Sequence, residues 1–437
     1  MTKYPNVNFA VISDLHFYDS SLGDEGAAFE QELSMDRKML VESEELLDHM
    51  IEDLLDSDIK FLMVCGDLTK DGEAVNHKKL SAKLQVLVNR GIKVTVTPGN
   101  HDINNYGAAR FSGSVKDSVS SISAEGFKKI YGEMGYRDAL MSDSNSLSYV
   151  SEPIPGLWVL AIDSCCYNEN SADRTLSTVG GRIKKSTAQW LTAVLEDAKK
   201  MSKPVIAFLH HGLIEHWDGQ LRLDPDSLIE NHRHIGQLLA TNDVRFVFTG
   251  HNHAQSIAQS TFSKKYLCEV GTGSLITYPC PIRYCNLSNN SLTISTETLA
   301  EKMRLDSDFL DAAINSVKDY VHHVTYKDLL EYRLSDADAG YISNALGEAF
   351  VAHYSGNADM SLNSAVPPTK LSIWGRIVFS IHKKYVIDPL WKSASKENNH
   401  TKISIEPEFA NKEYYFGEKL FMSLKKFIFS YTFEKAA

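Results

Sequence analysis

Five short segments of the 437-residue sequence place carboxylate, imidazole or amide side chains directly after an apolar run. They are SDLH (Asp14 and His16), CGDLT (Asp67), PGNHD (Asn100, His101 and Asp102), FLHHG (His210 and His211) and FTGHNH (His251 and His253). Mixed carboxylate and imidazole donors suit borderline divalent metals such as Mn, Fe, Co, Ni or Zn. So many candidate ligands exceed the needs of one ion, and they fit two ions about 3.5–4 Å apart that share a carboxylate. The pattern therefore predicts a binuclear metal centre.

The apolar runs before these segments have the character of β-strands, and helical patterns separate them. The runs span 8–13, 59–64, 92–97, 157–163, 203–210 and 244–250, and the helical patterns span 40–55, 73–90, 186–201 and 227–240. Alternation of this kind is typical of a sheet covered on both faces, with ligands at the carboxyl ends of the strands. From about 262 to 297 short strands follow without helices. We expect an α/β fold, a sandwich of two sheets flanked by helices, with all five segments at one edge.

Two local features explain how the segments present their side chains. In the D-x-H and H-x-H patterns, alternate side chains project the same way if the segment is extended. Glycine directly before Asp67, Asn100 and His251 lets the backbone turn sharply and approach a ligand closely.

The composition indicates which binding partners and which cellular compartment to expect. The formal net charge of −11 argues against a nucleic-acid polymer as partner, although it permits a small anion held by metal. The six cysteines show no zinc-type CxxC spacing, and the adjacent pair Cys165 and Cys166 suits reduced thiols in the cytoplasm better than a disulfide framework. We expect no signal peptide, and no apolar run reaches the ~18–20 residues of a membrane-spanning helix.

The character of the chain changes near residue 298. Helical periodicity dominates 301–355 and returns near 370–391 and 411–433. We therefore expect a catalytic domain over 1–297 and a mainly helical C-terminal domain over 298–437. In the run 419–431, apolar side chains share one helical face with lysines opposite, which favours packing within this domain over a membrane surface. The domain has two candidate roles: it influences substrate choice, or it serves stability and homo-oligomerisation.

The order D-x-H, GD, GNHD, H, GHxH resembles the five motifs of the calcineurin-like metallophosphoesterase family, nearest to its cyclic nucleotide phosphodiesterase-like branch. The resemblance covers roughly residues 8–297. It implies one metal ion held by Asp14, His16, Asp67 and His253, and a second held by Asp67, Asn100, His210 and His251. It also implies that His101 protonates the leaving oxygen or stabilises the transition state, and that Asp102 orients His101.

The expected activity is hydrolysis of phosphoesters, above all small phosphodiesters such as cyclic nucleotides, by attack of a metal-bound hydroxide. Electrostatics supports this, because two divalent cations outweigh the charges of Asp14, Asp67 and one hydroxide and so attract a phosphate ester. The alternatives are a phosphomonoesterase for a small metabolite or a phosphoprotein, and a non-catalytic scaffold. The complete set of ligand candidates argues against the scaffold.

Four further residues have open interpretations. His211 follows the ligand candidate His210 directly. It could contact the ligands from behind or face the solvent, or it could be a ligand itself. His216 is a loop residue or a substrate contact. Arg283 pairs with a carboxylate or meets the phosphate. Gly212 stands where the family often has proline, so the conformation of that loop is an open question.

Overall fold

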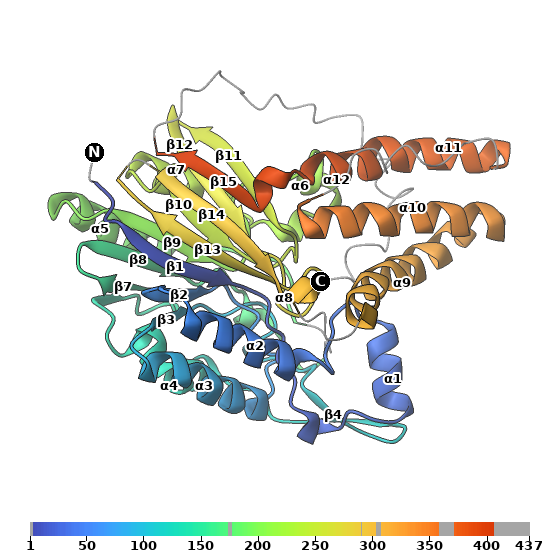
Figure 1. The fold of residues 1–437 in the computed structure, drawn as a ribbon, viewed down its shortest axis with the longest axis horizontal. Coiled ribbons are helices and arrows are strands. Elements are labelled where there is room, and N and C mark those ends of the chain that lie inside the picture. Colours follow the sequence, from blue (N-terminus) through green and yellow to red (C-terminus); the bar gives the residue numbers. More distant parts are fainter. Residues whose placement is uncertain (1–2, 174–176, 290, 303–306, 358–370, 406–437) are drawn as a thin grey trace.

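The computed structural model describes residues 3–173, 177–289, 291–302, 307–357 and 371–405. Two β-sheets pack face to face, helices cover their outer faces, and further helices project from one end (Figure 1). The predicted α/β sandwich flanked by helices is therefore confirmed.

The first sheet has six strands in the order β15-β14-β13-β1-β2-β3. Their bounds are His400–Ser404 (β15), Ser291–Thr298 (β14), Pro281–Leu287 (β13), Val7–Ile12 (β1), Phe61–Val64 (β2) and Lys93–Val96 (β3). The second sheet has seven strands in the order β11-β12-β10-β9-β8-β7-β6. Their bounds are Ser256–Phe262 (β11), Lys265–Gly271 (β12), Phe246–Thr249 (β10), Val205–Leu209 (β9), Leu157–Ile162 (β8), Tyr149–Ile154 (β7) and Met141–Ser142 (β6).

The helices of the sandwich are α1 (Ala27–Ser34), α2 (Ser43–Asp56), α3 (Ala74–Asn89), α4 (Ala124–Ile130), α5 (Lys185–Lys200), α6 (Gln220–Leu223), α7 (His232–Thr241) and α8 (Leu299–Lys302). Helices α2 and α3 lie over the first sheet (Figure 1), and α5 and α7 share a hydrophobic cluster with the second. Between 98 and 140, where no element is predicted, the structure also has the hairpin β4 (Ala109–Ser112) and β5 (Val115–Ser118).

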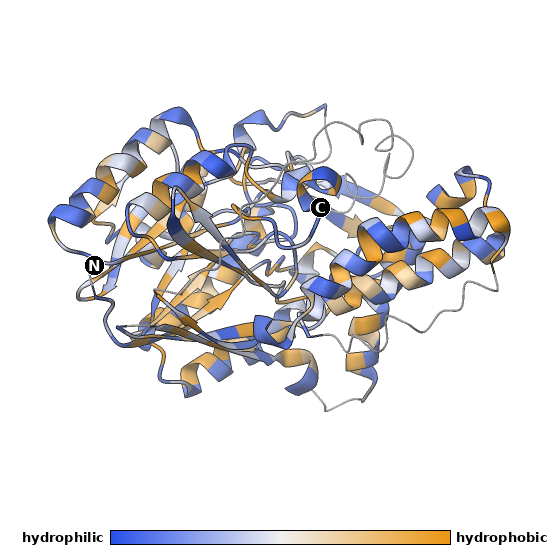
Figure 2. Ribbon diagram, turned by 90° about the horizontal axis from the view of Figure 1, so that it is seen from above, coloured by the Kyte–Doolittle hydropathy of each residue, from blue (hydrophilic) through white to orange (hydrophobic). Residues whose placement is uncertain are grey.

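The core between the sheets is aromatic. Phe9 of β1 stacks on Phe61 of β2 with ring centroids 4.7 Å apart, and it meets Phe248 of β10 edge-on at 5.6 Å. These contacts join the two sheets in one buried cluster, and Figure 2 shows hydrophobic residues along the strands and a mixture of hydrophobic and hydrophilic residues along the helices. Large buried aromatic faces of this kind supply much of the packing energy of a sandwich.

Parallel pairing brings the predicted motif loops to one edge. Strand β1 runs parallel to β2 and β2 to β3 in the first sheet, while β8, β9 and β10 are mutually parallel in the second. Because the carboxyl ends of parallel strands share an edge, the loops after β1, β2, β3, β9 and β10 leave the sandwich on the same side.

The C-terminal segment builds a helical appendage with its own hydrophobic core. It contains α9 (Ser307–Glu331), α10 (Asp336–Ser355), α11 (Ile373–His382) and α12 (Asp388–Ser393). The segment then returns to the sandwich, because β15 pairs antiparallel with β14. This strand was not predicted. The predicted helix near 411–433, with its apolar face over 420–431, lies outside the described residues.

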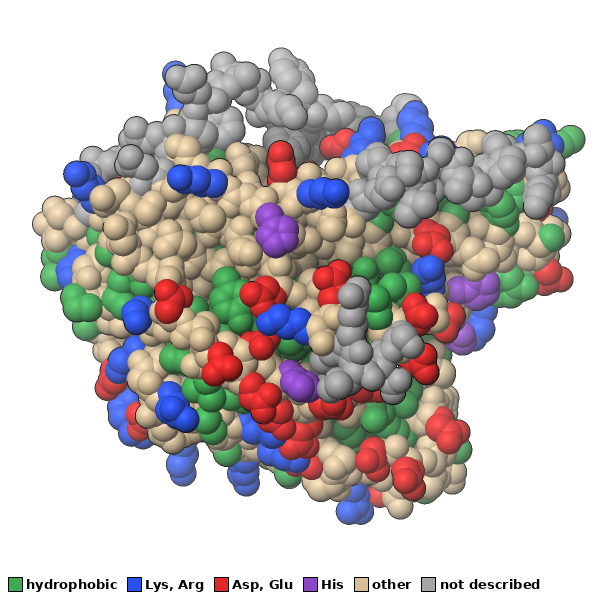
Figure 3. All heavy atoms as spheres, viewed as in Figure 1, with side chains coloured by type: hydrophobic (Ala, Val, Ile, Leu, Met, Phe, Trp, Pro, Cys, Tyr) green, Lys and Arg blue, Asp and Glu red, His purple; other side chains and the backbone are tan. Residues whose placement is uncertain are grey.

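The surface carries charges of both signs. Figure 3 shows acidic and basic side chains of the described residues interspersed on one face rather than gathered into a basic patch. Within the described part of the chain, none of the helices is both long enough and apolar enough to cross a bilayer.

Candidate metal centre

The five motif loops meet at one edge of the sandwich, as expected. The amide of Asp14 donates to Gly66 O at 3.0 Å, and the amide of His16 donates to Asp67 O at 2.9 Å, so the loops after β1 and β2 lie against each other. The amide of His251 donates to Asp14 Oδ2 at 3.0 Å, which brings in the loop after β10 from the other sheet. All seven predicted ligands lie in this region.

Asp14, His16 and His253 form the first group of donor atoms. One ligand atom from each lies within 4.8 Å of the others. His253 Nε2 is 3.4 Å from Asp14 Oδ1 and 3.2 Å from His16 Nε2. His16 Nε2 is also 3.6 Å from Asp67 Oδ2, so this group borders Asp67.

Asp67, His210 and His251 form the second group, again within 4.8 Å of one another. His210 Nε2 lies 3.3 Å from Asp67 Oδ2 and 3.2 Å from His251 Nδ1. Asn100 Oδ1 is 3.0 Å from the same His210 nitrogen. Asp67 thus stands between the two groups, in the place of a shared carboxylate.

The hydrogen bonds around His210 show that the donor set fits a cation. His210 Nδ1 lies 2.8 Å from Cys65 O, and because a carbonyl only accepts, Nδ1 carries a proton. In the neutral ring Nε2 therefore carries a lone pair and no proton. It nevertheless faces two further acceptors, the oxygens of Asp67 and Asn100. Burial alone would lower the pKa of His210, but the charge of Asp67 outweighs burial and raises it to about 9. A positive charge between His210 Nε2 and these oxygens is therefore stabilised, and a metal ion supplies it as well as a proton does.

The backbone at the ligands is left-handed. Asp14, His16, Asp67, His251 and His253 have φ between 37° and 69°. The extended geometry expected for D-x-H and H-x-H is therefore wrong at these residues, and their convergence comes from tight turns instead. Left-handed backbone is costly for residues other than glycine and collects at functional sites.

Two glycines are required by close approach rather than by φ. A Cβ at Gly250 would overlap Ser13 Oγ and Asp14 Oδ2, and a Cβ at Gly99 would overlap the backbone and carboxylate of Asp67. The turns before His251 and Asn100 can therefore pack directly against the two carboxylates only because neither glycine has a side chain.

A scan of known protein families matches residues 7–255 to the family described as calcineurin-like phosphoesterase. The chain belongs to this family. Members bind two metal ions, and both donor groups lie within the matched segment. The protein is thus a metallophosphoesterase.

A search of solved structures also found similar chains. A dimetal phosphatase from Danio rerio is 15% identical, with a TM-score of 0.46 over 68% of this chain and 97% of its own. A purple acid phosphatase from yellow lupin seeds is 10% identical, with a TM-score of 0.41 over 68% of this chain and 52% of its own. A phosphopantetheinyl hydrolase from Mycobacterium tuberculosis is 13% identical, with a TM-score of 0.32 over 63% of this chain and 91% of its own. A search of curated proteins found no match.

In the phosphoesterase, His101 lies beside both donor groups. Its ring is 4.9 Å from that of His16, and its amide donates to Asp67 Oδ1 at 2.9 Å. His101 Nδ1 is 2.9 Å from Asp71 Oδ1. Burial lowers the pKa of His101, but Asp67 and the hydrogen bond to Asp71 outweigh it, so the pKa is raised. This favours the protonated imidazole that an acid needs.

The hydrogen bonds correct the expected role of Asp102. Its carboxylate accepts from the amides of Leu68 at 2.9 Å, Thr69 at 3.0 Å and Gly99 at 2.8 Å. It therefore ties the loop after β3 to the loop after β2 and does not orient His101. Asp71 does so instead. It was not among the predicted site residues, although it follows Asp67 by four positions in GDLTKDG.

The residues with open interpretations lie around the phosphoesterase centre without entering it. His211 packs behind His251, with Nδ1 2.8 Å from Ser164 Oγ and Nε2 donating to Val179 O at 2.8 Å. His216 Nε2 bonds to Glu269 at 3.0 Å. Gly212 forms an isolated parallel bridge with Leu228, in which its amide donates to Ser227 O at 2.9 Å.

Arg283 takes neither of its expected roles. It is fully buried in β13 and donates to Gly271 O, Asn398 O and Thr296 Oγ1. Its guanidinium donates to backbone carbonyls instead of contacting a phosphate or a carboxylate. It thereby links Gly271 of the sandwich to Asn398 of the C-terminal segment.

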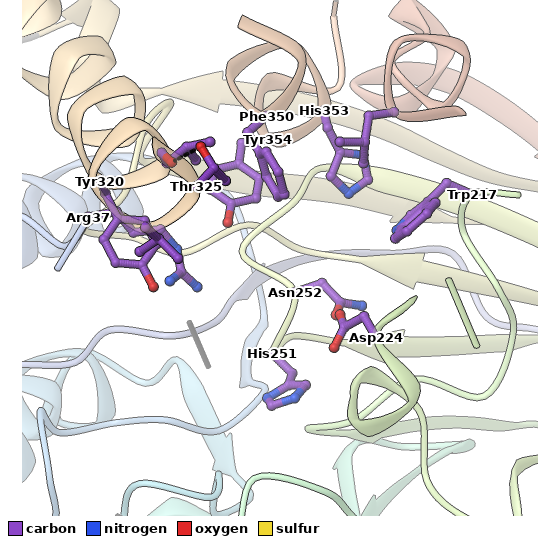
Figure 4. A pocket seen from close by; sticks show the side chains of 13 residues that line it. Arg37, Trp217, Asp224, His251, Asn252, Tyr320, Thr325, Phe350, His353 and Tyr354 are labelled. Carbon is purple, nitrogen blue, oxygen red and sulfur yellow. Dashed lines mark hydrogen bonds between the residues drawn. The ribbon is translucent and has the colours of Figure 1, made fainter. Parts of the chain in front are cut away.

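A pocket opens beside His251, between the metal edge and the appendage (Figure 4). Among the residues that line it are Arg37, Trp217, Asp224, Tyr320, Phe350 and Tyr354. The guanidinium of Arg37 lies over the rings of Tyr320 and Tyr354, at 5.4 and 5.8 Å. The sequence carries no local signal for this pocket, because its lining residues are separated by up to about 350 positions, from Arg37 to Leu390.

Proposed function

We propose that this phosphoesterase hydrolyses small phosphodiesters, cyclic nucleotides among them, with two divalent ions of Mn, Fe, Co, Ni or Zn. The observation that carries the proposal is the pocket beside His251. A diester has a second organic group on phosphorus and one negative charge, whereas a monoester lacks that group and carries up to two charges. The pocket offers aromatic walls for the second group.

The proposed ligand sets follow from the two donor groups. Asp14, His16, Asp67 and His253 would hold one ion, and Asp67, Asn100, His210 and His251 the other. When bound, two such cations supply Lewis acidity at the phosphoryl oxygens and lower the pKa of water.

The protein's own residues would have separate roles in the reaction. The shared Asp67 carboxylate offsets the repulsion between the cations, and it is fixed by the His101 amide. His101, with Nδ1 against Asp71, presents Nε2 for proton donation to the leaving oxygen. Asp102 keeps the two loops in register through the three backbone amides that it accepts from.

We also propose a division into two domains, a cellular location and a role for the appendage. The division into a domain over 1–297 and a helical domain over 298–437 is supported by the separate hydrophobic core of the appendage. A cytoplasmic location is supported by the six buried free thiols. The appendage would influence substrate choice. Stability or homo-oligomerisation through the appendage is the competing explanation of its role.

Hydrolysis assays that compare diester and monoester substrates test the proposed function. Purified full-length protein loaded with Mn, Fe, Co or Zn should be given bis-p-nitrophenyl phosphate, p-nitrophenyl phosphate and cyclic nucleotides. We expect kcat/KM for diesters to exceed that for the monoester at least about tenfold. A preference for the monoester would establish the phosphomonoesterase alternative, and no turnover by a chain with two bound metals would favour the scaffold.

A further inference from the structure

The pocket beside His251 has two chemically different sides. The side from the sandwich carries the metal-edge residues His251 and Asn252 and the half-buried carboxylate of Asp224. The side from the appendage carries Phe350, His353 and Tyr354 of α10, with their side chains directed towards the pocket (Figure 4). A group attached to a phosphate at the metal edge would therefore enter a space whose far wall belongs to the appendage.

The hydrogen bonds of His353 determine what it offers to a ligand. His353 Nδ1 lies 2.7 Å from Ser393 Oγ, and the Ser393 hydroxyl donates its only proton to Leu390 O at 2.7 Å. Ser393 Oγ must therefore accept from His353, so Nδ1 carries the hydrogen. Burial lowers the pKa of His353 to about 3, which keeps the ring neutral. Nε2 is consequently a lone-pair acceptor, and no described residue bonds to it.

Asp224 adds a second polar group across the pocket, and burial raises the pKa of its carboxyl to about 7. Its carboxylate lies beside Asn252, on the side opposite His353 (Figure 4). Between these polar groups lie the aromatic side chains of Trp217, Phe350 and Tyr354. Aromatic side chains favour planar groups that stack on them, and a buried acceptor without a partner, here His353 Nε2, favours a group that brings an N–H or O–H donor.

We propose that this pocket is a subsite for the non-scissile group of the diester, and that it selects planar heteroaromatic groups bearing N–H donors, such as an amino-substituted nucleobase, through His353. The inference rests on the proposed diesterase function and extends it to a specificity-determining residue. His353 acts on binding of this group and does not touch the reacting phosphorus.

Two substrates with the same leaving group isolate the subsite. Adenosine 5′-(p-nitrophenyl phosphate) and methyl p-nitrophenyl phosphate differ only in the non-scissile group, so the ratio of their kcat/KM values reports the subsite alone. We expect this ratio to be large in the native chain and to fall about five- to thirtyfold in His353→Phe, as for loss of a hydrogen bond that leaves a buried donor unpaired. The purine riboside ester, which lacks the amino group, should show a smaller native ratio and little further loss in His353→Phe.

The matched control is His382→Phe. His382 is a buried histidine in α11 of the same appendage, and its Nδ1 donates to Val378 O at 2.9 Å. It does not line the pocket, so the ratio should keep its native value. Ser393→Ala provides a second variant if His353→Phe folds poorly, because loss of the Ser393 acceptor frees His353 to change tautomer and should also lower the ratio.

The outcomes separate this inference from the proposed function. An unchanged ratio in His353→Phe and Ser393→Ala, with both chains folded and carrying metal, overturns the subsite while methyl ester hydrolysis leaves the diesterase intact. If no diester is hydrolysed, calorimetry on the metal-loaded chain decides with adenosine 5′-monophosphate against methyl phosphate. Tighter binding of the adenosine compound that is lost in His353→Phe supports the subsite, and equal binding of both compounds overturns it.

Discussion

His101 and Asp71 form a hydrogen-bonded pair at the metal edge, with His101 Nδ1 2.9 Å from Asp71 Oδ1. The carboxylate sits on the loop after β2 and the imidazole on the loop after β3, so the pair spans two adjacent strands of the first sheet. Asp71 in turn pairs with the buried Lys70, and the pKa of Asp71 is strongly lowered because the neighbouring Lys70 and His101 outweigh its burial. Asp71 is therefore an anion that stabilises the protonated form of His101.

Replacement of Asp71 by asparagine should change the pH profile. The anionic Asp71 raises the pKa of His101, so Asp71→Asn lowers that pKa. Proton donation requires protonated His101, and the basic limb of the kcat profile should therefore move to lower pH. At neutral pH we expect turnover of alkyl esters to fall about 10- to 100-fold. Stopped assays from pH 5 to 9 measure this, and an unmoved basic limb would show that His101 is not the titrating acid.

Removal of the His101 imidazole should separate metal binding from turnover. His101→Ala should retain two ions and lose about 10²–10⁴ in kcat, the usual contribution of a positioned acid. The loss should be smaller for p-nitrophenyl esters, whose leaving group needs little protonation. Equal losses for p-nitrophenyl and alkyl esters would instead assign His101 to stabilisation of transition-state charge.

Asp67, the proposed shared carboxylate, should matter more for metal content and activity than His211, which lies behind His251. Asp67→Asn keeps the shape of the side chain but removes the charge between the two donor groups, so we expect fewer than two ions per chain and a loss of activity beyond about 100-fold. His211→Ala, which alters only contacts to Ser164, Val179 and the back of His251, should keep both ions. Metal analysis by mass spectrometry decides, and two ions retained in Asp67→Asn would contradict a bridging role.

Close packing at Gly250 predicts a large effect of one methyl group. In Gly250→Ala the new Cβ would overlap Ser13 Oγ and Asp14 Oδ2, so the chain should lose about 1–3 kcal/mol of unfolding free energy and bind the ion at Asp14 weakly. Gly132→Ala is the matched control, since its Cβ would have only the end of Arg137 nearby, at 3.7 Å. Urea unfolding and metal content are the measurements. Similar stability of the two variants would show that the turn can relax.

Arg37 should hold the appendage against the metal edge. Arg37→Met keeps an apolar stem but loses the guanidinium over Tyr320 and Tyr354, so about 1–2 kcal/mol of cation–π attachment should disappear. Hydrogen exchange in α9 and α10 should accelerate while exchange in β1 and β2 is unaffected. Truncation at residue 298 is a poorer test, because it also removes β15 from its pairing with β14. Unchanged exchange in α9 and α10 would assign the attachment to other contacts.

The sequence alone predicted the sandwich and the identity of the metal-ligand candidates. Each ligand follows an apolar strand by a few residues, and parallel strands bring such positions to one edge whatever the remaining contacts are. The positions of the strand ends do not decide whether Asp71 or Asp102 is the partner of His101. That choice depends on side-chain directions in left-handed turns, where the alternation of an extended strand does not apply.

Only the tertiary structure decided the contacts between distant segments. Strand β15 joins β14 after more than a hundred intervening residues, and Arg283 becomes a link between backbone carbonyls instead of a charge partner. The pocket brings Arg37 to Tyr320 and Tyr354 in the same way. Such pairings depend on how separately folded layers pack, and local periodicity reports which face of an element is apolar without specifying its partner.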